Sequence, residues 1–440
     1  MNQRSTATWP GPHGNRLEFG AVSLIFAAVT LLSAYLQAAR PLLFGDAKEY
    51  YGMAQQFGAG LPFAMAEAPF VYRIATPWLA GFATRPLIYD VVPFFVINIT
   101  SAFVIALLLL VWLRQFVASP AVRLLLVTMF LAEWHGPARF VYFYPIYVDP
   151  LFIVFLMAGL LLVVRTRLQP PERVAPVLAL VVFLGTLSRE SMVVVALAFI
   201  ACHNAFTAGS RNWRPRDAVW AIVPLLAALL ALAYTRAVGF PTAPYSPLSE
   251  PLSMLHKKPV FTWVLAYFFT FGPAALALIA ADGRRAIEFL RSRPELAVYL
   301  VSCGILSFFG GTDTERIACW GAPVVYLLVG RAIERHWTAL RSVPLVAVLV
   351  GAQVVSERIL WPIPSTYYIV KAFTDFDSRL AQLYDAVNRL IVIDTHYANL
   401  WSYFGSRPWH ALLLAYDISF VVVVALWIRA RASRLRTAAG

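Results

Sequence analysis

Long apolar stretches separated by short polar segments run from about residue 20 almost to the C-terminus. A helix that crosses a bilayer needs about 20 predominantly apolar residues. Twelve stretches approach that length, at residues 20–39, 91–113, 121–134, 148–164, 174–187, 191–206, 218–238, 261–281, 296–310, 317–331, 343–359 and 409–428. Helix tilt or a locally thinned membrane accommodates the short ones. The pattern predicts an all-α integral membrane protein, a polytopic bundle of about 12 transmembrane helices that forms a single transmembrane domain over residues 1–440.

The segment 174–206 admits two interpretations, one long helix or two shorter ones. A single helix would be about 50 Å long at about 1.5 Å per residue, against a hydrocarbon core of about 30 Å. It would also place Arg189 and Glu190 at the bilayer centre, which costs several kcal/mol. The sequence therefore predicts two helices, with these two charged residues in a turn at the membrane surface.

Arginine residues mark the loops on one side of the predicted bundle. These loops and the tail contain Arg114, Arg123, Arg165, Arg167, Arg173, Arg211, Arg214, Arg216, Arg284, Arg285, Arg291, Arg293, Arg331, Arg335, Arg341, Arg429, Arg431, Arg434 and Arg436. Short basic loops stay in the cytoplasm, and one long helix over 174–206 would reverse the later ones. The preference for arginine over lysine is typical of a GC-rich bacterial genome. We therefore expect a multi-pass protein of a bacterial inner (plasma) membrane with both termini cytoplasmic and no cleaved signal peptide.

Composition agrees with this class. Hydrophobic residues make up 60% of the 440 residues, charged residues only 13%, and the mean hydropathy is +0.69. The net charge of +13 would fit a nucleic-acid partner, but the basic residues lie in short loops and are better explained by topology. No nucleic-acid partner is expected. The three cysteines, Cys202, Cys303 and Cys319, have no CxxC or zinc spacing, so neither a disulfide framework nor a metal site is predicted from them.

The predicted topology places two long loops on the outer face, at residues 40–90 and 360–408, and shorter outer segments at 135–147, 188–191, 239–260 and 311–316. Long loops in compact proteins usually carry function or their own helices. Residues 46–54 and 377–387 have helical spacing. Both are expected to form amphipathic helices on the outer surface.

The first outer loop is rich in candidate functional residues. Asp46, Glu49, Tyr50 and Met53 would share one helix face by their spacing. Further on, Tyr72 and Arg73 stand among apolar and aromatic residues. A surface helix followed by an interfacial aromatic belt remains an equally good interpretation of this loop, because aromatic residues favour membrane interfaces.

Other outer polar residues lie at the ends of predicted spans, and each has a simpler structural interpretation. Asp149 precedes Pro150 and fits a helix cap. Arg189 and Glu190 fit a local ion pair, and the turn 310–316 fits a tight connection or a phosphate-binding loop. Taken together, the ionisable candidates that meet at the outer face are Asp46, Glu49, Arg73, Asp149, Arg189, Glu190, Asp313 and Arg316. Their convergence from distant parts of the chain predicts a functional site.

The segment Asp46-Ala47-Lys48-Glu49-Tyr50 resembles a motif of the GT-C superfamily of membrane glycosyltransferases. Many members carry Asp-Glu-x-x-Tyr or Asp-x-x-x-Tyr just after the first span. Here the Asp and Tyr positions match, and Ala47 stands in place of the second acid with Glu49 nearby. The Asp149-Pro150 helix start and the Arg189-Glu190 turn are also similar to bacterial members.

This resemblance implies an inverting transfer of a sugar from a polyprenyl-phosphate donor to a glycan, lipid or protein acceptor at the outer (periplasmic) face. Asp46 is expected to act as general base. Arg316, with Arg189 and Arg73 behind it, is expected to hold the departing lipid phosphate. The expected donor- and substrate-binding residues are Glu49, Tyr50, Tyr72, Arg73, Asp149, Arg189, Glu190, Asp313 and Arg316. No cofactor is required by the pattern, and a divalent cation stays open as an alternative.

A secondary transporter of a polar solute or of a lipid-linked substrate is the alternative. Transporters usually show internal repeats and polar sites near the membrane midplane. Asp417, inside the last predicted span, favours this alternative, whereas the lack of a repeat and the gathering of polar residues at one face favour the enzyme. A non-enzymatic scaffold is the third interpretation, and the two long charged outer loops argue against it.

Overall fold

Helices make up nearly all of the chain that the structure describes. The computed structural model describes residues 12–36, 45–84, 91–167, 169–203, 215–246, 248–359 and 401–437. The larger helices are α1 (Pro12–Leu36), α4 (Val92–Leu113), α5 (Pro120–Ala132), α7 (Asp149–Arg165), α8 (Pro171–Ser188), α9 (Val193–Cys202), α10 (Pro215–Val238), α12 (Val260–Ala281), α14 (Pro294–Phe309), α16 (Ala322–Arg335), α18 (Val343–Ser356) and α20 (Arg407–Thr437). The predicted all-α class is confirmed.

Shorter elements connect these helices. They are α2 (Asp46–Gly58), β1 (Ala64–Ala66), η1 (Phe70–Tyr72), α3 (Ala75–Thr84), α6 (Pro137–Phe143), η2 (Glu190–Met192), β2 (Gly239–Pro241), α11 (Ser249–Lys257), α13 (Gly283–Ser292), α15 (Thr314–Ala318), η3 (Cys319–Gly321) and α17 (Trp337–Leu340). The two strands pair in parallel, with Ala64 opposite Gly239, and tie the segment after α2 to the end of α10.

Each of the twelve predicted spans falls on a helix or a run of helices. In the described chain, seven are long and apolar enough to cross a membrane: Arg16–Tyr35, Val92–Leu113, Pro171–Ser188, Val219–Val238, Val260–Ala281, Thr314–Arg335 and Arg407–Leu435. The chain is therefore a helical, multi-pass membrane protein. The other five predicted spans fall on the shorter helices α5, α7, α9, α14 and α18, so the count of twelve stays a prediction.

The charged turn in the segment 174–206 separates two helices, as predicted. Helix α8 ends at Ser188 and α9 begins at Val193, with η2 between them. The predicted outer helix at 46–54 is present as part of α2. The second predicted helix, 377–387, and most of the loop 360–408 lie outside the described residues.

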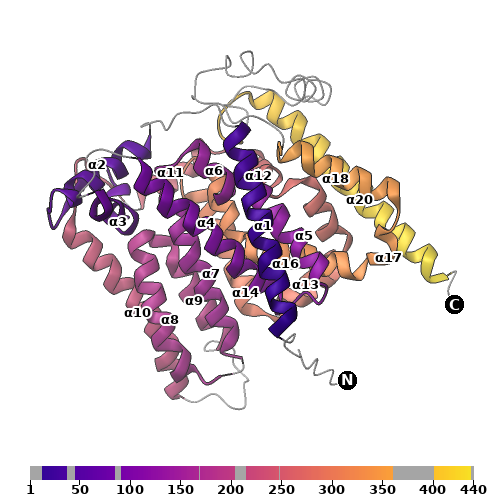
Figure 1. The fold of residues 1–440 in the computed structure, drawn as a ribbon, viewed down its shortest axis with the longest axis horizontal. Coiled ribbons are helices and arrows are strands. Elements are labelled where there is room, and N and C mark those ends of the chain that lie inside the picture. Colours follow the sequence, from indigo (N-terminus) through magenta and orange to yellow (C-terminus); the bar gives the residue numbers. More distant parts are fainter. Residues whose placement is uncertain are drawn as a thin grey trace.

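Figure 1 shows α2 and α3 together at one corner of the bundle, and both chain ends lie lower in the view. Helices α12, α18 and α20 pack together on the other side of the molecule. The backbone of α12 breaks at Gly272, whose φ of 75° is rarely open to residues with a Cβ. The Gln353 amide fills the break and donates to the Phe271 carbonyl oxygen at 2.9 Å.

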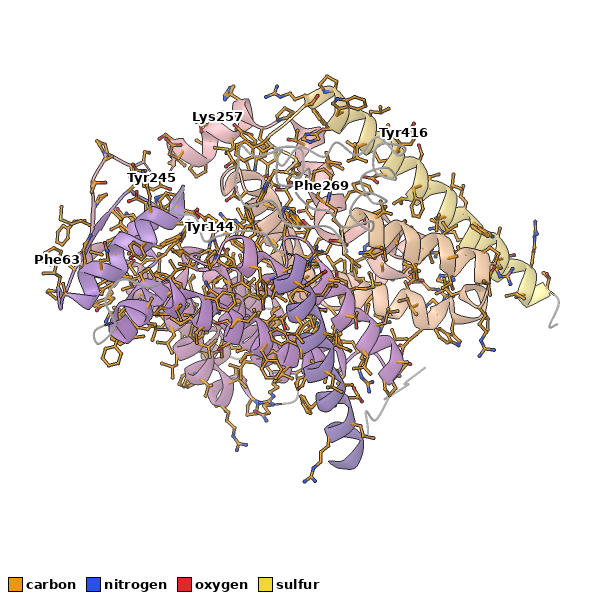
Figure 2. All side chains as sticks on the ribbon, turned by 45° about the horizontal axis from the view of Figure 1, so that its top comes forward. Phe63, Tyr144, Tyr245, Lys257, Phe269 and Tyr416 are labelled. Atoms are coloured by element: carbon orange, nitrogen blue, oxygen red, sulfur yellow. The ribbon has the colours of Figure 1, made fainter. Side chains whose placement is uncertain are left out.

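The described chain packs around two large hydrophobic cores and a third, small cluster of Leu265, Phe268, Phe269 and Leu414. The larger core joins the long helices. The smaller core lies under α2, α3 and α6 and is rich in aromatic side chains, including Tyr50, Trp134, Phe140 and Tyr144. Figure 2 shows Tyr144 in the interior, with Tyr245 and Lys257 nearer the edge. Because the second core holds the outer segments rigidly on the bundle, polar side chains at their junction are held in fixed positions.

Candidate active site

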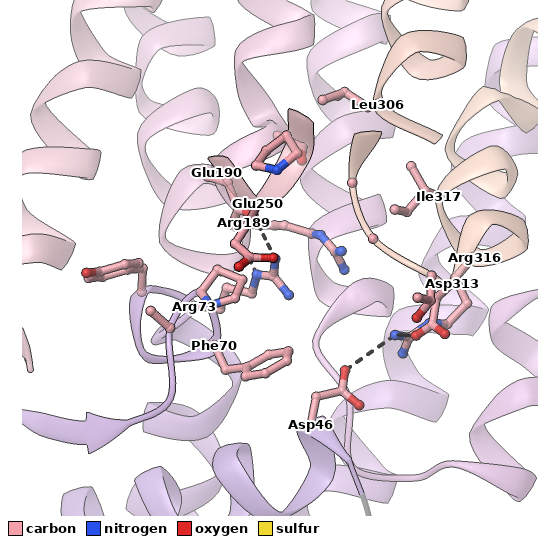
Figure 3. A pocket seen from close by; sticks show the side chains of 18 of the residues that line it. Asp46, Phe70, Arg73, Arg189, Glu190, Glu250, Leu306, Asp313, Arg316 and Ile317 are labelled. Atoms are coloured by element: carbon pink, nitrogen blue, oxygen red, sulfur yellow. Dashed lines mark hydrogen bonds and ion pairs between the residues drawn. The ribbon is translucent and has the colours of Figure 1, made fainter. Parts of the chain in front are cut away.

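A cavity of about 1160 Å³ opens between the segment that contains α2 and η1 and the long helices of the bundle. Its walls come from segments that are distant in sequence: α2, η1, α6, the α8–α9 turn, α10, α11, α14, the turn before α15 and residues 401–404. Small-molecule sites commonly occupy about 300–1,000 Å³. The cavity is therefore large enough for a substrate with several chemical parts (Figure 3).

Asp46 projects from the first turn of α2 into this cavity. The preceding Gly45 has a φ of 56°, which a residue without Cβ adopts readily and which turns the chain into the helix. The Tyr144 hydroxyl donates a short hydrogen bond to Asp46 Oδ1 and accepts one from the Ala47 backbone N–H at 2.7 Å. A single phenol therefore fixes both the start of α2 and its acidic side chain.

Arg316 is surrounded by carboxylates. Its Nη2 lies 3.3 Å from Asp46 Oδ2 and also pairs with Asp313, and its Nη1 lies 3.8 Å from Asp149 Oδ2. The guanidinium also lies 5.9 Å from the ring centre of Tyr144. Three carboxylates around one cation leave little of its charge for an additional anion.

Arg189 has a different environment. Its Nη1 donates to Asp149 Oδ1 at 2.5 Å, and its guanidinium lies 4.6 Å from the ring centre of Trp320. Its Nε is buried and makes no hydrogen bond within the described chain. Figure 3 shows this side chain extending into the cavity between the Arg73 side and the Arg316 side. Arg189 therefore offers donor capacity to a ligand.

Arg73 and Glu190 form the other side of the cavity. Arg73 donates to both Glu190 oxygens, at 2.7 Å and 3.1 Å, and to the Tyr50 hydroxyl at 3.1 Å. The Arg73 side chain is 6% exposed and that of Glu190 is 40% exposed, so the carboxylate faces the cavity and the guanidinium lies behind it. The bidentate geometry fixes the turn between α8 and α9 to the outer segment.

The protonation of these groups follows from burial and neighbouring charge. Burial would raise the pKa of Glu190, but the charge and hydrogen bonds of Arg73 outweigh it and lower that pKa to about 2. Burial raises the pKa of Tyr50 to about 12 and that of Tyr144 further still, so both remain hydrogen-bond donors. Burial also raises the pKa of Asp313, against the effect of Arg316. Burial and the nearby Arg73 lower the pKa of Arg189, so an anion there would relieve unfavourable interactions.

The structure brings most of the predicted site residues together. The cavity is lined by Asp46, Tyr72, Arg73, Arg189, Glu190, Asp313 and Arg316. Asp149 and Tyr50 lie just behind the lining, where they bind Arg189 and Arg73. The helix-cap interpretation of Asp149 is wrong, because Val148 occupies the N-cap position and the Asp149 carboxylate pairs with Arg189 and Arg316. The local ion-pair interpretation of Arg189 and Glu190 is also wrong, since each pairs with a distant residue.

Glu49 also lies outside the cavity lining and, unlike Tyr50 and Asp149, it has no hydrogen bond or ion pair with a lining residue in the described chain. Its Oε2 accepts a hydrogen bond from the Glu67 backbone N–H at 2.8 Å, and its Oε1 lies 3.5 Å from Lys48 Nζ. Asp46, Glu49, Tyr50 and Met53 belong to one helix, as predicted. The side chains of Tyr50 and Met53, however, are buried in the core. Of the residues of α2, only the first, Asp46, lines the cavity.

Several cavity residues were not identified from the sequence. Arg236, Glu250 and Trp401 line the cavity, and Trp401 is the first described residue after the predicted loop 360–408 begins. Lys258 is buried beside the cavity wall, where its Nζ donates to the Ser307 and Gly311 carbonyl oxygens at 3.0 Å and 2.6 Å. Arg236 lies near the end of the predicted span 218–238 and Lys258 shortly before the span 261–281, which was the available signal.

Metal binding has little support in this arrangement. Among the described residues, no group of three or more His, Cys, Asp and Glu side chains has the geometry to hold a metal ion. The nearest carboxylates, Asp46, Asp149 and Asp313, surround Arg316 instead. Comparison of the chain with protein-family models, curated proteins and solved structures gave no match.

Proposed function

We propose that this protein is a GT-C-like membrane glycosyltransferase that uses a polyprenyl-phosphate sugar donor in the cavity around Asp46. The proposal includes about twelve spans, both termini in the cytoplasm of a bacterium and the cavity at the outer face of its inner membrane. The observation that carries it is the presence, in one cavity, of a carboxylate and a buried guanidinium with unused donor capacity. A group that accepts a proton and a group that binds phosphate are the two requirements of the reaction.

In the proposed reaction, an acceptor hydroxyl attacks the anomeric carbon of the donor sugar. Asp46 takes the hydroxyl proton as the new carbon–oxygen bond forms. The bond between the anomeric carbon and the phosphate oxygen breaks, and the lipid phosphate leaves with the electron pair. Attack from the face opposite the phosphate inverts the anomeric centre. Tyr144 and Arg316 hold the Asp46 carboxylate in position for this step.

Arg189 replaces Arg316 as the first candidate for the phosphate. The Nε of each arginine is buried and unpartnered within the described chain, but Arg316 is paired with three carboxylates and Arg189 with Asp149 alone. A guanidinium with free donors can hold two phosphate oxygens. Charge that develops on the leaving phosphate would then be stabilised in an enclosed site.

The apolar part of the cavity suits a lipid chain. Leu232 from α10 and Leu306 and Phe309 from α14 line its wall, and α10 and α14 both pack against α9. Both helices also expose apolar side chains on their outer surfaces, such as Leu230 and Val301. A polyprenyl chain would occupy this apolar wall while its phosphate reaches the charged end of the same cavity.

The test is to replace Asp46 with asparagine in the purified protein in nanodiscs. Each of a panel of polyprenyl-phosphate sugars is supplied with membrane extract as acceptor source, and free polyprenyl phosphate is measured by mass spectrometry. The wild type should release polyprenyl phosphate from at least one donor. Asp46→Asn should abolish release, and Glu67→Gln, an exposed carboxylate from the same outer segment, should retain it. Full activity of Asp46→Asn, or no release from any donor by the wild type, contradicts the proposal.

A secondary transporter is favoured by one separate observation. Beside the break in α12 lie Gln353 and the carboxylates of Glu133 and Glu357, which are fully buried. Broken helices with buried ionisable groups are typical of ion-coupled transporters. Proteoliposomes distinguish the two functions. Sugar uptake driven by a proton gradient and lost in Glu133→Gln would support transport, and donor turnover without uptake would support the enzyme.

A further inference from the structure

Helix α11 has three chemically distinct sides. At 3.6 residues per turn, Leu248, Leu252 and Leu255 form one apolar stripe, and their side chains are exposed by 70%, 46% and 54%. A second side, with Glu250, Pro251 and Met254, lines the cavity. The third side carries the polar residues Ser249, Ser253, His256 and Lys257. A helix buried on one side and exposed to water on the rest would not need the leucine stripe.

The depth of α11 is fixed by the ends of two membrane helices. Two residues, Lys258 and Pro259, separate α11 from the apolar helix α12. Helix α12 begins at Val260, whose side chain is 63% exposed. Lys258, between them, donates from Nζ to the carbonyl oxygens of Ser307, near the end of α14, and of Gly311, just after it. Helix α11 also packs against α14. Its last turn therefore lies level with the start of α12 and the end of α14.

We propose that α11 lies in the lipid–water boundary, with Leu248, Leu252 and Leu255 inserted among the lipids of the leaflet that adjoins the cavity. At this depth the surroundings of an exposed side chain are lipid head groups and the upper acyl chains. An apolar stripe beside a basic end is the pattern of a helix that lies in a membrane interface. His256 and Lys257 would then face the head groups and the water.

The insertion has a consequence for the cavity. The side of α11 that lines the cavity and the leucine stripe belong to the same short helix. Helix α11 therefore separates the cavity from the lipid along its length. Met254 is buried and faces the cavity, while Leu255, the next residue, is exposed. The cavity is thereby adjacent to the membrane surface along α11, whatever reaction takes place in it.

Fluorescence quenching tests this placement without any assay of turnover. Single cysteines at Leu252 and Leu255 are introduced in a Cys202→Ser background, since Cys303 and Cys319 are buried. They are labelled with an environment-sensitive fluorophore, and Lys257→Cys serves as the matched control from the same turn. The protein is placed in phosphatidylcholine nanodiscs, either with brominated acyl chains or with iodide in the buffer.

Labels at residues 252 and 255 should be quenched by the brominated lipid and protected from iodide, and the label at 257 should show the opposite. The ratio of lipid to iodide quenching should differ severalfold between stripe and control. Equal iodide quenching at all three positions would place the stripe in water and overturn the proposal. Protection of the stripe labels from both quenchers would overturn it too, because a second protein surface would then cover the leucines. None of these outcomes depends on Asp46 or on donor turnover.

Discussion

The Tyr144 hydroxyl donates a hydrogen bond to Oδ1 of Asp46 across 98 residues of sequence. The hydroxyl oxygen of Tyr144 also accepts a hydrogen bond from the Ala47 backbone N–H at 2.7 Å, so the phenol links the end of α6 to the first turn of α2. Arg316 approaches the other oxygen of Asp46 at 3.3 Å. The candidate base is thus oriented by groups from two distant segments, which is how precise catalytic geometry is usually maintained.

Replacing Tyr144 with phenylalanine removes this bond with little change in volume. A hydrogen bond to a charged group contributes about 1.5–3 kcal/mol, so the rate of donor cleavage should fall about 10- to 100-fold. The KM for the donor should change less, since Tyr144 acts on the orientation of Asp46. Tyr142→Phe, from the same helix and outside the cavity lining, is the control. Equal rates in the wild type and Tyr144→Phe would show that Tyr144 does not position the base.

Arg189→Gln should weaken binding of the lipid phosphate. Polyprenyl phosphate, the product shared by all donors of the class, is titrated into the protein in nanodiscs, with polyprenol as the uncharged comparison. Loss of a charged hydrogen bond should raise the Kd for the phosphate about 10- to 100-fold and leave polyprenol binding unchanged. Arg284→Gln, whose side chain is 92% exposed, is the control. An unchanged Kd would remove Arg189 from the phosphate site.

Breaking the Arg73–Glu190 pair should destabilise the outer segment. Arg73→Met leaves Glu190 without its partner and should cost about 1–3 kcal/mol, less than for a fully buried pair because Glu190 faces the cavity. Since Arg73 lowers the pKa of Glu190 from 4.5 to about 2, this stabilisation is present above about pH 4.5 and is lost as the pH falls towards 2. Thermal unfolding of both single variants and the double variant measures the coupling. Additive losses would mean that the pair does not contribute.

Lys258 predicts a second increase of stability with pH, in the alkaline range. Burial lowers its pKa from 10.5 to about 8, with Glu315 and Asp313 partly offsetting the shift. The unfolded chain then binds this proton more tightly than the folded one, so stability rises as the pH increases from about 8 to 10.5. The Tm of the wild type minus the Tm of Lys258→Met should therefore increase over that range. Lys257→Met, which removes an exposed lysine from the neighbouring position, is the control. Parallel curves for Lys258→Met would contradict the prediction.

The pattern of apolar residues was sufficient to predict the helices, because the membrane imposes a length and a composition on any segment that crosses it. The turn at Arg189 and Glu190 was predicted for the same reason, since the cost of two charges in the bilayer centre decides between one helix and two. The gathering of charged residues at one end of the bundle also followed from the sequence, because it depends only on where the spans end.

Which charged residues pair was decided by the tertiary structure alone. Arg189 and Glu190 are adjacent in sequence, yet they bind Asp149 and Arg73, because the extended backbone at Arg189 directs successive side chains apart. Glu49 lies about one helical turn after Asp46. Its carboxylate accepts a hydrogen bond from the Glu67 backbone N–H, whereas that of Asp46 faces the cavity. Position along a helix determines the direction of a side chain relative to its neighbours. Which partner lies in that direction depends on how helices distant in sequence pack, and helix periodicity contains no information about that packing.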